Sequence, residues 1–165
     1  MNINTEKGIS LVETIVYIAI FSMFVVSLAS FSTTLSTTRL HTQGVLEVNE
    51  QGSQILRLIT QTIRNADGVN SPSISASSAT LSIETGVPAT NPTTFYASGG
   101  VLYITEGSGS AVALTNNKIS VSNLSFTNLS RPGTPNIVRV AFTVTNVSAR
   151  DPFTANFGGS GAIRK

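Results

Sequence analysis

The first half of the chain is dominated by one long apolar run. Residues 9–31 are almost wholly hydrophobic, and residues 14–38 contain no charged side chain. A helix needs roughly 20 apolar residues to cross a bilayer, so this run is long enough. The alternative is a buried helix of a soluble protein, but so short a chain can hardly cover a charge-free run of this length. The pattern therefore predicts a transmembrane helix over residues 9–31.

The helical pattern continues beyond the apolar run, with a polar side added. Apolar residues recur mostly at spacings of three and four, as in an amphipathic helix: Leu40, Val45, Leu46, Val48, Ile55, Leu56, Ile59 and Ile63. Gly44 and Gly52 each weaken a helix by about 1 kcal/mol relative to alanine, which favours a local bend. Gly68 is expected to close the helix in the left-handed conformation. We therefore expect one helix over residues 9–66, with its front in lipid or against other chains and its rear packed on its own domain.

From residue 67 onward the pattern is typical of β-structure. Serine, threonine, asparagine and glycine alternate with short apolar runs, as in half-buried strands. Residues 93–98 and 101–105 flank Gly99 and Gly100 and predict a hairpin. A period of two places four apolar side chains on one face of a later strand: Val138, Val140, Phe142 and Val144. We expect a single antiparallel sheet of about four to six strands, with one face against the rear of the helix.

Two details of this β-rich half carry specific predictions. Ile119 and Val121 occupy odd positions, whereas Leu124 and Phe126 occupy even ones. This change of phase predicts a bulge or a strand break near Ser122 and Asn123. The glycine-rich residues 158–161 are expected to form a turn before a final short strand.

Composition adds limits on size and on the class of partner. The chain has 165 residues, of which 11% are charged, against about 25% in soluble domains. Mean hydropathy is +0.22, which favours a membrane segment over a fully soluble protein. The net charge of +2 is spread along the chain without a basic run, and cysteine is absent. A disulfide framework and a thiolate metal site are therefore excluded.

The start of the apolar run carries the most specific motif. A short polar leader with Lys7 ends in Gly8, the apolar Ile9 follows, and Glu13 is the fifth residue counted from Ile9. The long apolar helix begins directly behind this pattern. The combination resembles the processing signal of type IV prepilins and pseudopilins.

The resemblance implies a role for each of these residues. Prepilin peptidase would cut after Gly8, where the missing side chain lets an extended backbone enter the protease. Ile9 would then carry a new, N-methylated α-amino group, and Lys7 would keep the leader, residues 1–8, in the cytoplasm. Glu13 would neutralise the amine of a neighbouring subunit, because an ionised carboxylate costs about 2.5–3.5 kcal/mol at the bilayer centre. The competing explanation is that a helix N-terminus favours a carboxylate by about 0.3–1 kcal/mol.

The resemblance also implies a fold and a location. The expected fold is α+β, a pilin fold in which the second half of the long helix packs on an antiparallel β-rich domain over residues 67–165. The chain looks more like minor pilins and J-type pseudopilins than major pilins, and Ser30 stands where many major pilins have a helix-kinking proline. It would be a single-pass inner-membrane protein and then part of a filament, with the C-terminal domain outside the cytoplasm.

The partners implied by the resemblance are those of filament assembly. They are prepilin peptidase, other pilins or pseudopilins of the same filament, the inner-membrane assembly platform and membrane lipid. The resemblance fits a type IV pilus, a type II secretion pseudopilus and a competence filament alike.

A catalytic function finds little support in the residues. The only histidine is His41, and the acids after Asp67, which are Glu84, Glu106 and Asp151, are far apart in the sequence. No nucleophile and base pair is recognisable among them. The sequence therefore predicts a protein that is not an enzyme and needs neither a metal nor another cofactor.

Two other functions remain open. In one, Ser27, Leu28 and Ala29 form a signal-peptidase site, and the chain is a secreted or membrane-anchored β-domain binding protein. In the other, the pilin-like protein also binds DNA through its basic residues, which in the β-rich half are Lys118, Arg131, Arg139, Arg150, Arg164 and Lys165. DNA is the weaker of the two, because six basic residues face four acidic ones there.

Overall fold

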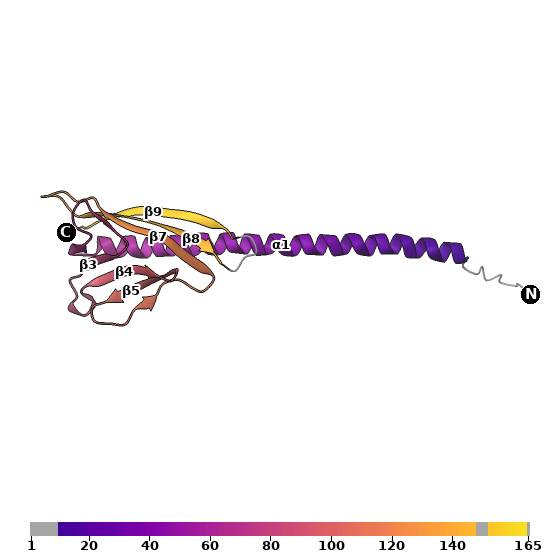
Figure 1. The fold of residues 1–165 in the computed structure, drawn as a ribbon, viewed down its shortest axis with the longest axis horizontal. Coiled ribbons are helices and arrows are strands. Elements are labelled where there is room, and N and C mark those ends of the chain that lie inside the picture. The colour runs from indigo at the N-terminus through magenta and orange to yellow at the C-terminus, as the bar shows by residue number, and fades with distance from the viewer. Residues whose placement is uncertain (1–9, 148–151, 165) are drawn as a thin grey trace, which may run out of the picture. The chain divides into compact units, whose positions relative to one another are not determined.

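The computed structural model describes residues 10–147 and 152–164, leaving aside the side chains of residues 36–41. The fold is of the α+β class: the helix α1 (Leu11–Arg64) is followed by antiparallel strands. The chain divides into two units, Met1–Leu40 and His41–Lys165. Figure 1 labels α1 and several of the strands.

α1 is shorter than the predicted range of 9–66 at its C-terminal end. It ends at Arg64, and the last turn tightens because the Ala66 amide donates to the Ile63 carbonyl at 3.2 Å. The expectation that Gly68 closes the helix in the left-handed conformation is wrong. Gly68 instead begins the strand β1 (Gly68–Ser71), where it pairs with Glu84. The predicted start at Ile9 lies outside the described residues.

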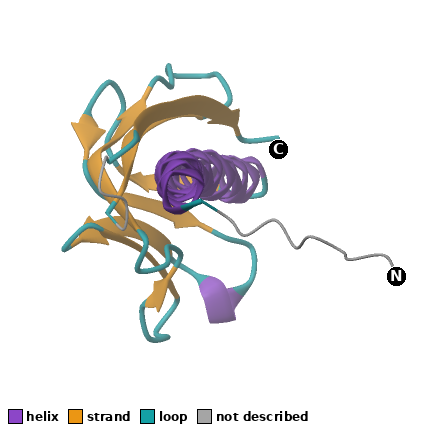
Figure 2. Cartoon of the chain, turned by 90° about the vertical axis from the view of Figure 1, so that its right-hand side faces the viewer, coloured by secondary structure: helices purple, strands orange, loops and turns teal. Residues whose placement is uncertain are grey.

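The rear of α1 contributes one buried stripe to the core of the second unit. Val48, Ile55, Ile59 and Ile63 are at most 2% exposed, and their spacings of seven, four and four place them on one helix face. Leu46, which the amphipathic pattern included, is 61% exposed. Viewed along the helix, the strands of the second unit curve around one side of it (Figure 2).

The strands form two sheets, so the expectation of a single sheet is wrong. The first has the order β1-β3-β4-β5-β6, with the further strands β3 (Leu81–Glu84), β4 (Thr93–Ser98), β5 (Val101–Glu106) and β6 (Val112–Ala113). The second has the order β2-β7-β8-β9, with β2 (Ser77–Ser78), β7 (Ile119–Asn128), β8 (Ile137–Asn146) and β9 (Thr154–Ala162). A short 3-10 helix, η1 (Pro88–Thr90), precedes β4. Alternation along a strand shows which side chains face inward but not which strand is its neighbour.

The local predictions for the strands are confirmed. β4 and β5 form the hairpin around Gly99 and Gly100, whose φ angles of 59° and 82° are those that this two-residue turn requires. The pairing of β7 with β8 shifts register between Ser122 and Ser125, and Asn123 has a φ of 52°. All four apolar side chains predicted for the inward face of β8 are at most 2% exposed.

The glycines near the C-terminus do not form the predicted turn. Gly158, Gly159 and Gly161 lie within β9, which pairs with β8 along its whole length. A Cβ on Gly161 would lie 2.8 Å from Ile63 Cγ2, and one on Gly159 would lie 3.1 Å from Leu56 Cδ1. Glycine is needed there because β9 passes closely over the rear of α1.

A polar contact also links α1 to the loop before β7. The Asn116 side-chain amide donates to Glu47 Oε1, and Asn116 Oδ1 accepts from the Lys118 amide at 3.0 Å. Lys118 Nζ lies 3.9 Å from Glu47 Oε2, with 60% of the Lys118 side chain exposed. The hydrogen bonds of Asn116, rather than the solvated ion pair, are therefore expected to hold this loop.

We predict that Asn116→Ala lowers the free energy of unfolding by about 1 kcal/mol, because the amide bonds of Asn116 are lost. Lys118→Ala serves as the control and should change this free energy by less than about 0.5 kcal/mol. Chemical unfolding of the intact chain in detergent micelles, followed by near-UV circular dichroism, measures both. An equal loss of unfolding free energy in the two variants would show that the hydrogen bonds of Asn116 do not hold the loop more strongly than the ion pair of Lys118.

Candidate functional site

The first part of α1 is the candidate site, because it exposes a continuous apolar surface. The stretch Leu11–Leu35 has a mean hydropathy of 2.2 and is long and apolar enough to cross a membrane. None of its most apolar window is buried within the structure, and Met23, for example, is 77% exposed. Soluble monomers rarely expose apolar surface on this scale, so this segment is a candidate for contact with lipid or with other chains.

Several hydroxyl side chains within this stretch donate hydrogen bonds to the helix backbone. The Ser22 hydroxyl donates to the Ile18 carbonyl at 2.7 Å, and the Ser30 hydroxyl donates to the Val26 carbonyl at 3.0 Å. Such bonds to the preceding turn allow serine to enter hydrocarbon without an unpaired hydroxyl. α1 continues through Ser30 without a break. These hydroxyls are therefore compatible with an apolar environment.

Glu13 is the exception in this surface. It lies in the first turn of α1 and is exposed. The backbone of this turn begins with the Thr14 amide, which donates to the Ser10 carbonyl at 3.1 Å. The Tyr17 hydroxyl, one turn further on, donates to Glu13 Oε1 at 3.0 Å. The carboxylate is thus held by one neighbour and keeps acceptor capacity for another group, since it has about four lone-pair sites.

Tyr17 was missed by the sequence argument, although its position gave a signal. Residues four apart on a helix lie on the same face, so a tyrosine at this spacing is within reach of the glutamate. The other predicted site residues, Lys7, Gly8 and Ile9, lie outside the described residues. The structure therefore places Glu13 and Tyr17 together and leaves the predicted cleavage site unplaced.

Within residues 10–147 and 152–164, no three acid, histidine or cysteine side chains come together in a way that could hold a metal ion. Comparisons of the chain with protein-family models, with curated proteins and with solved structures gave no match.

Proposed function

We propose that this chain is a structural subunit, of the minor pilin or pseudopilin kind, of a type IV pilus or a type II secretion-like pseudopilus. The observation that carries the proposal is Glu13, an exposed carboxylate in the first turn of an apolar helix that has no other charged side chain as far as residue 38. An isolated acid at the edge of such a surface is costly unless a partner satisfies it.

The partner we propose is the α-amino group that cleavage after Gly8 would create on Ile9. In a bundle of such helices, each subunit offers one positive amine and one negative Glu13. Both charges are paired only when neighbouring helices take the correct axial stagger, so the pair fixes register more than it adds stability. The apolar surface of Leu11–Leu35 would supply the packing between subunits.

Tyr17 adds a step to this proposal. Before assembly, its hydroxyl bond to Glu13 Oε1 would satisfy part of the carboxylate while the precursor lies in the membrane. A hydrogen bond to a charged group contributes about 1.5–3 kcal/mol, less than the cost of leaving a buried charge without any partner. The bond therefore lowers the cost of insertion without removing the need for the amine.

The proposal places the protein first in the inner membrane and later in a filament. The leader with Lys7 would remain in the cytoplasm, and residues 67–165 would lie outside it. Prepilin peptidase would act before assembly, and the assembly platform would then draw α1 out of lipid into contact with other pilin-like chains. This order requires that cleavage precede filament entry, because the amine exists only after the cut.

We predict that the mature protein begins at Ile9. Cleavage after Gly8 gives that terminus, whereas signal peptidase would give Ser30 and an uncut membrane anchor would give Met1. Amino-terminal sequencing or intact mass measurement of protein from the native membrane decides among the three. A Gly8→Val variant should stay uncut, because its branched side chain obstructs the extended backbone in the protease. Normal processing of that variant would refute the assigned site.

A further inference from the structure

The last strand of the second sheet has a free edge. β9 pairs with β8 alone, and the pairing runs without a register shift from Ala162 to Thr154. Beyond this ladder, no backbone hydrogen bond joins residues 154–162 to another part of the described chain. The other edge strands, β1, β2 and β6, have four, two and two residues, whereas β9 has nine. β9 is thus the longest edge available to a further strand.

This edge also lacks the usual protection. Natural sheets block a free edge with proline, with charged side chains or with a bulge. Residues 154–162 contain neither proline nor a charged residue, and their pairing has no bulge. The strand therefore presents an accessible row of backbone donors and acceptors.

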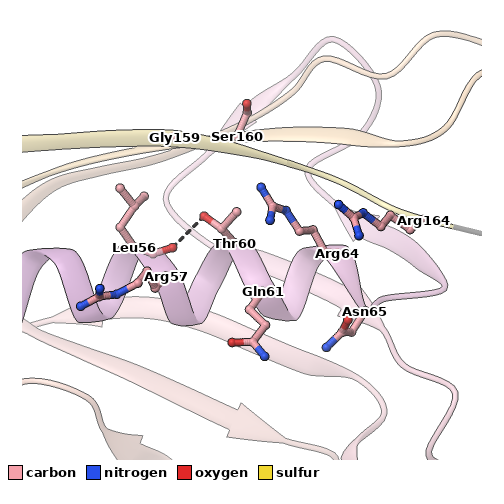
Figure 3. Close-up of a pocket in the computed structure, with 9 residues that line it drawn as sticks. All are labelled: Leu56, Arg57, Thr60, Gln61, Arg64, Asn65, Gly159, Ser160 and Arg164. Atoms are coloured by element: carbon pink, nitrogen blue, oxygen red, sulfur yellow. Dashed lines mark hydrogen bonds between the residues drawn. The ribbon is translucent and has the colours of Figure 1, made fainter.

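A basic hollow lies between this strand and the end of α1. It has a volume of about 460 Å³ and is lined by α1 and by β9 with the residues that follow it. Figure 3 shows Arg64 rising from the last turns of the helix, with Arg164 beside it. Arg57 lies seven residues before Arg64, on the same helix face. Gly159 and Ser160 of β9 form the opposite wall (Figure 3).

The three arginines have no carboxylate partner in the described chain. The ion pair that the described residues form joins Lys118 to Glu47. Neither of these two residues lines the hollow. Arg57, Arg64 and Arg164 are all exposed, and three like charges around one hollow repel one another. A bound anionic group would offset this repulsion, and guanidinium groups match carboxylates with two parallel hydrogen bonds.

We propose that this hollow binds an extended acidic segment of a partner protein, which adds a strand to β9 and places its carboxylates against Arg57, Arg64 and Arg164. Strand addition draws affinity from main-chain hydrogen bonds and specificity from alternate side chains. Arg57 and Arg64 lie about 10 Å apart along the helix axis, which an extended chain covers in about three residues. Carboxylates at alternate positions lie on one face of the segment at intervals of about 7 Å, and the long, flexible side chains of Arg57 and Arg64 cover the remaining difference of about 3 Å.

The partner is a different protein rather than a second copy of this chain. Its own eight acidic residues are scattered, and no two occupy adjacent or alternate positions. A peptide is favoured over a nucleic acid, because a peptide main chain can pair with both the N–H and the C=O groups along the edge of β9, whereas phosphate oxygens can only accept hydrogen bonds. This binding does not depend on the filament role, so the two proposals can fail separately.

The test uses the intact chain in micelles of an uncharged detergent. Fluorescence anisotropy measures binding of a labelled nine-residue peptide of alternating glutamate and threonine, and of a matched peptide with glutamine in place of glutamate. We expect the acidic peptide to bind more tightly than the glutamine peptide, and we expect its affinity to fall as the salt concentration increases. The affinity for the acidic peptide should fall at least tenfold in the triple variant Arg57→Gln/Arg64→Gln/Arg164→Gln. The control Arg131→Gln/Arg139→Gln, which removes two exposed arginines outside the hollow, should leave the affinity unchanged.

A third peptide tests the edge of β9 separately. Methylation of alternate backbone nitrogens keeps every carboxylate but removes the donors that pair with a strand, so this peptide should bind at least tenfold more weakly. Equal binding of the methylated peptide would overturn strand addition. If the acidic peptide does not bind, or if the triple variant binds it equally well, the proposal that the hollow is a binding site is wrong. Tighter binding of an oligonucleotide that is lost in the triple variant would identify a nucleic-acid surface instead.

Discussion

Glu13→Ala is expected to leave a protein that inserts into the membrane and is cleaved after Gly8 but does not enter the filament. Without the carboxylate, the amine of a neighbouring Ile9 is buried without its partner. Removing one member of a buried ion pair costs about 3–5 kcal/mol, which corresponds to at least a hundredfold loss of incorporation. Immunoblots of sheared filaments and of membranes, which separate precursor from mature protein, measure both steps.

Glu13→Gln is the matched control, because it keeps the length of the side chain and can still accept the hydroxyl bond from Tyr17. If Glu13 acts by neutralising the amine of a neighbouring Ile9, the glutamine variant should be excluded from the filament as the alanine variant is. If it assembles normally, Glu13 acts through its hydrogen bond or its place at the helix start, and the proposed pairing with the amine is wrong. Tyr17→Phe separates these effects further, since it removes the hydroxyl bond and leaves the charge.

Gly52→Val is expected to destabilise the second unit by about 2–3 kcal/mol, as overpacked sites do. Gly52 is buried on α1, and a Cβ at this position would overlap the ring of Phe157. That ring cannot move away freely, because it stacks on Phe142 with a centroid distance of 5.5 Å and an interplanar angle of 17°. Valine is the better helix former, so a loss of stability would show that packing outweighs propensity here.

Chemical unfolding of the intact chain in micelles measures this change. Gly158→Ala is the control, because the atom nearest to an added Cβ would be the Val140 carbonyl oxygen, at 3.6 Å. This variant should change the free energy of unfolding by less than about 0.5 kcal/mol. Phe157→Ala should cost less stability in the Gly52→Val background than in the parent, because the shorter side chain removes the overlap. A Gly52→Val variant as stable as the parent would show that the ring yields.

Local sequence patterns were sufficient to predict features that form within a single helix, turn or strand. The apolar run of residues 14–38 predicted a helix that can span a membrane, and Leu11–Leu35 meets that expectation. The turn at Gly99 and Gly100 and the change of phase near Asn123 were also predicted, because turn chemistry and side-chain alternation act over a few residues. The pair of Glu13 and Tyr17 follows from the same kind of local rule.

Contacts between distant segments were not predictable in this way. The glycines of residues 158–161 look like a turn in the sequence, yet they lie within β9 because that strand passes close to Leu56 and Ile63 of α1. Gly52 reads as a weak point of the helix, yet it makes room for Phe157. Glycine can serve a turn, a bulge or a close approach, and the sequence alone does not choose among these.

The sequence by itself determined an N-terminal apolar helix, a β-rich second half and an isolated acid at the start of the helix. These features depend on hydrophobicity, periodicity and charge, which are properties of neighbouring residues. Only the tertiary structure decided that the strands form two sheets, that β9 is a free edge and that Arg57, Arg64 and Arg164 surround one hollow. Each of these depends on which segments meet in space, and that choice is made by packing of the whole core rather than by any local pattern.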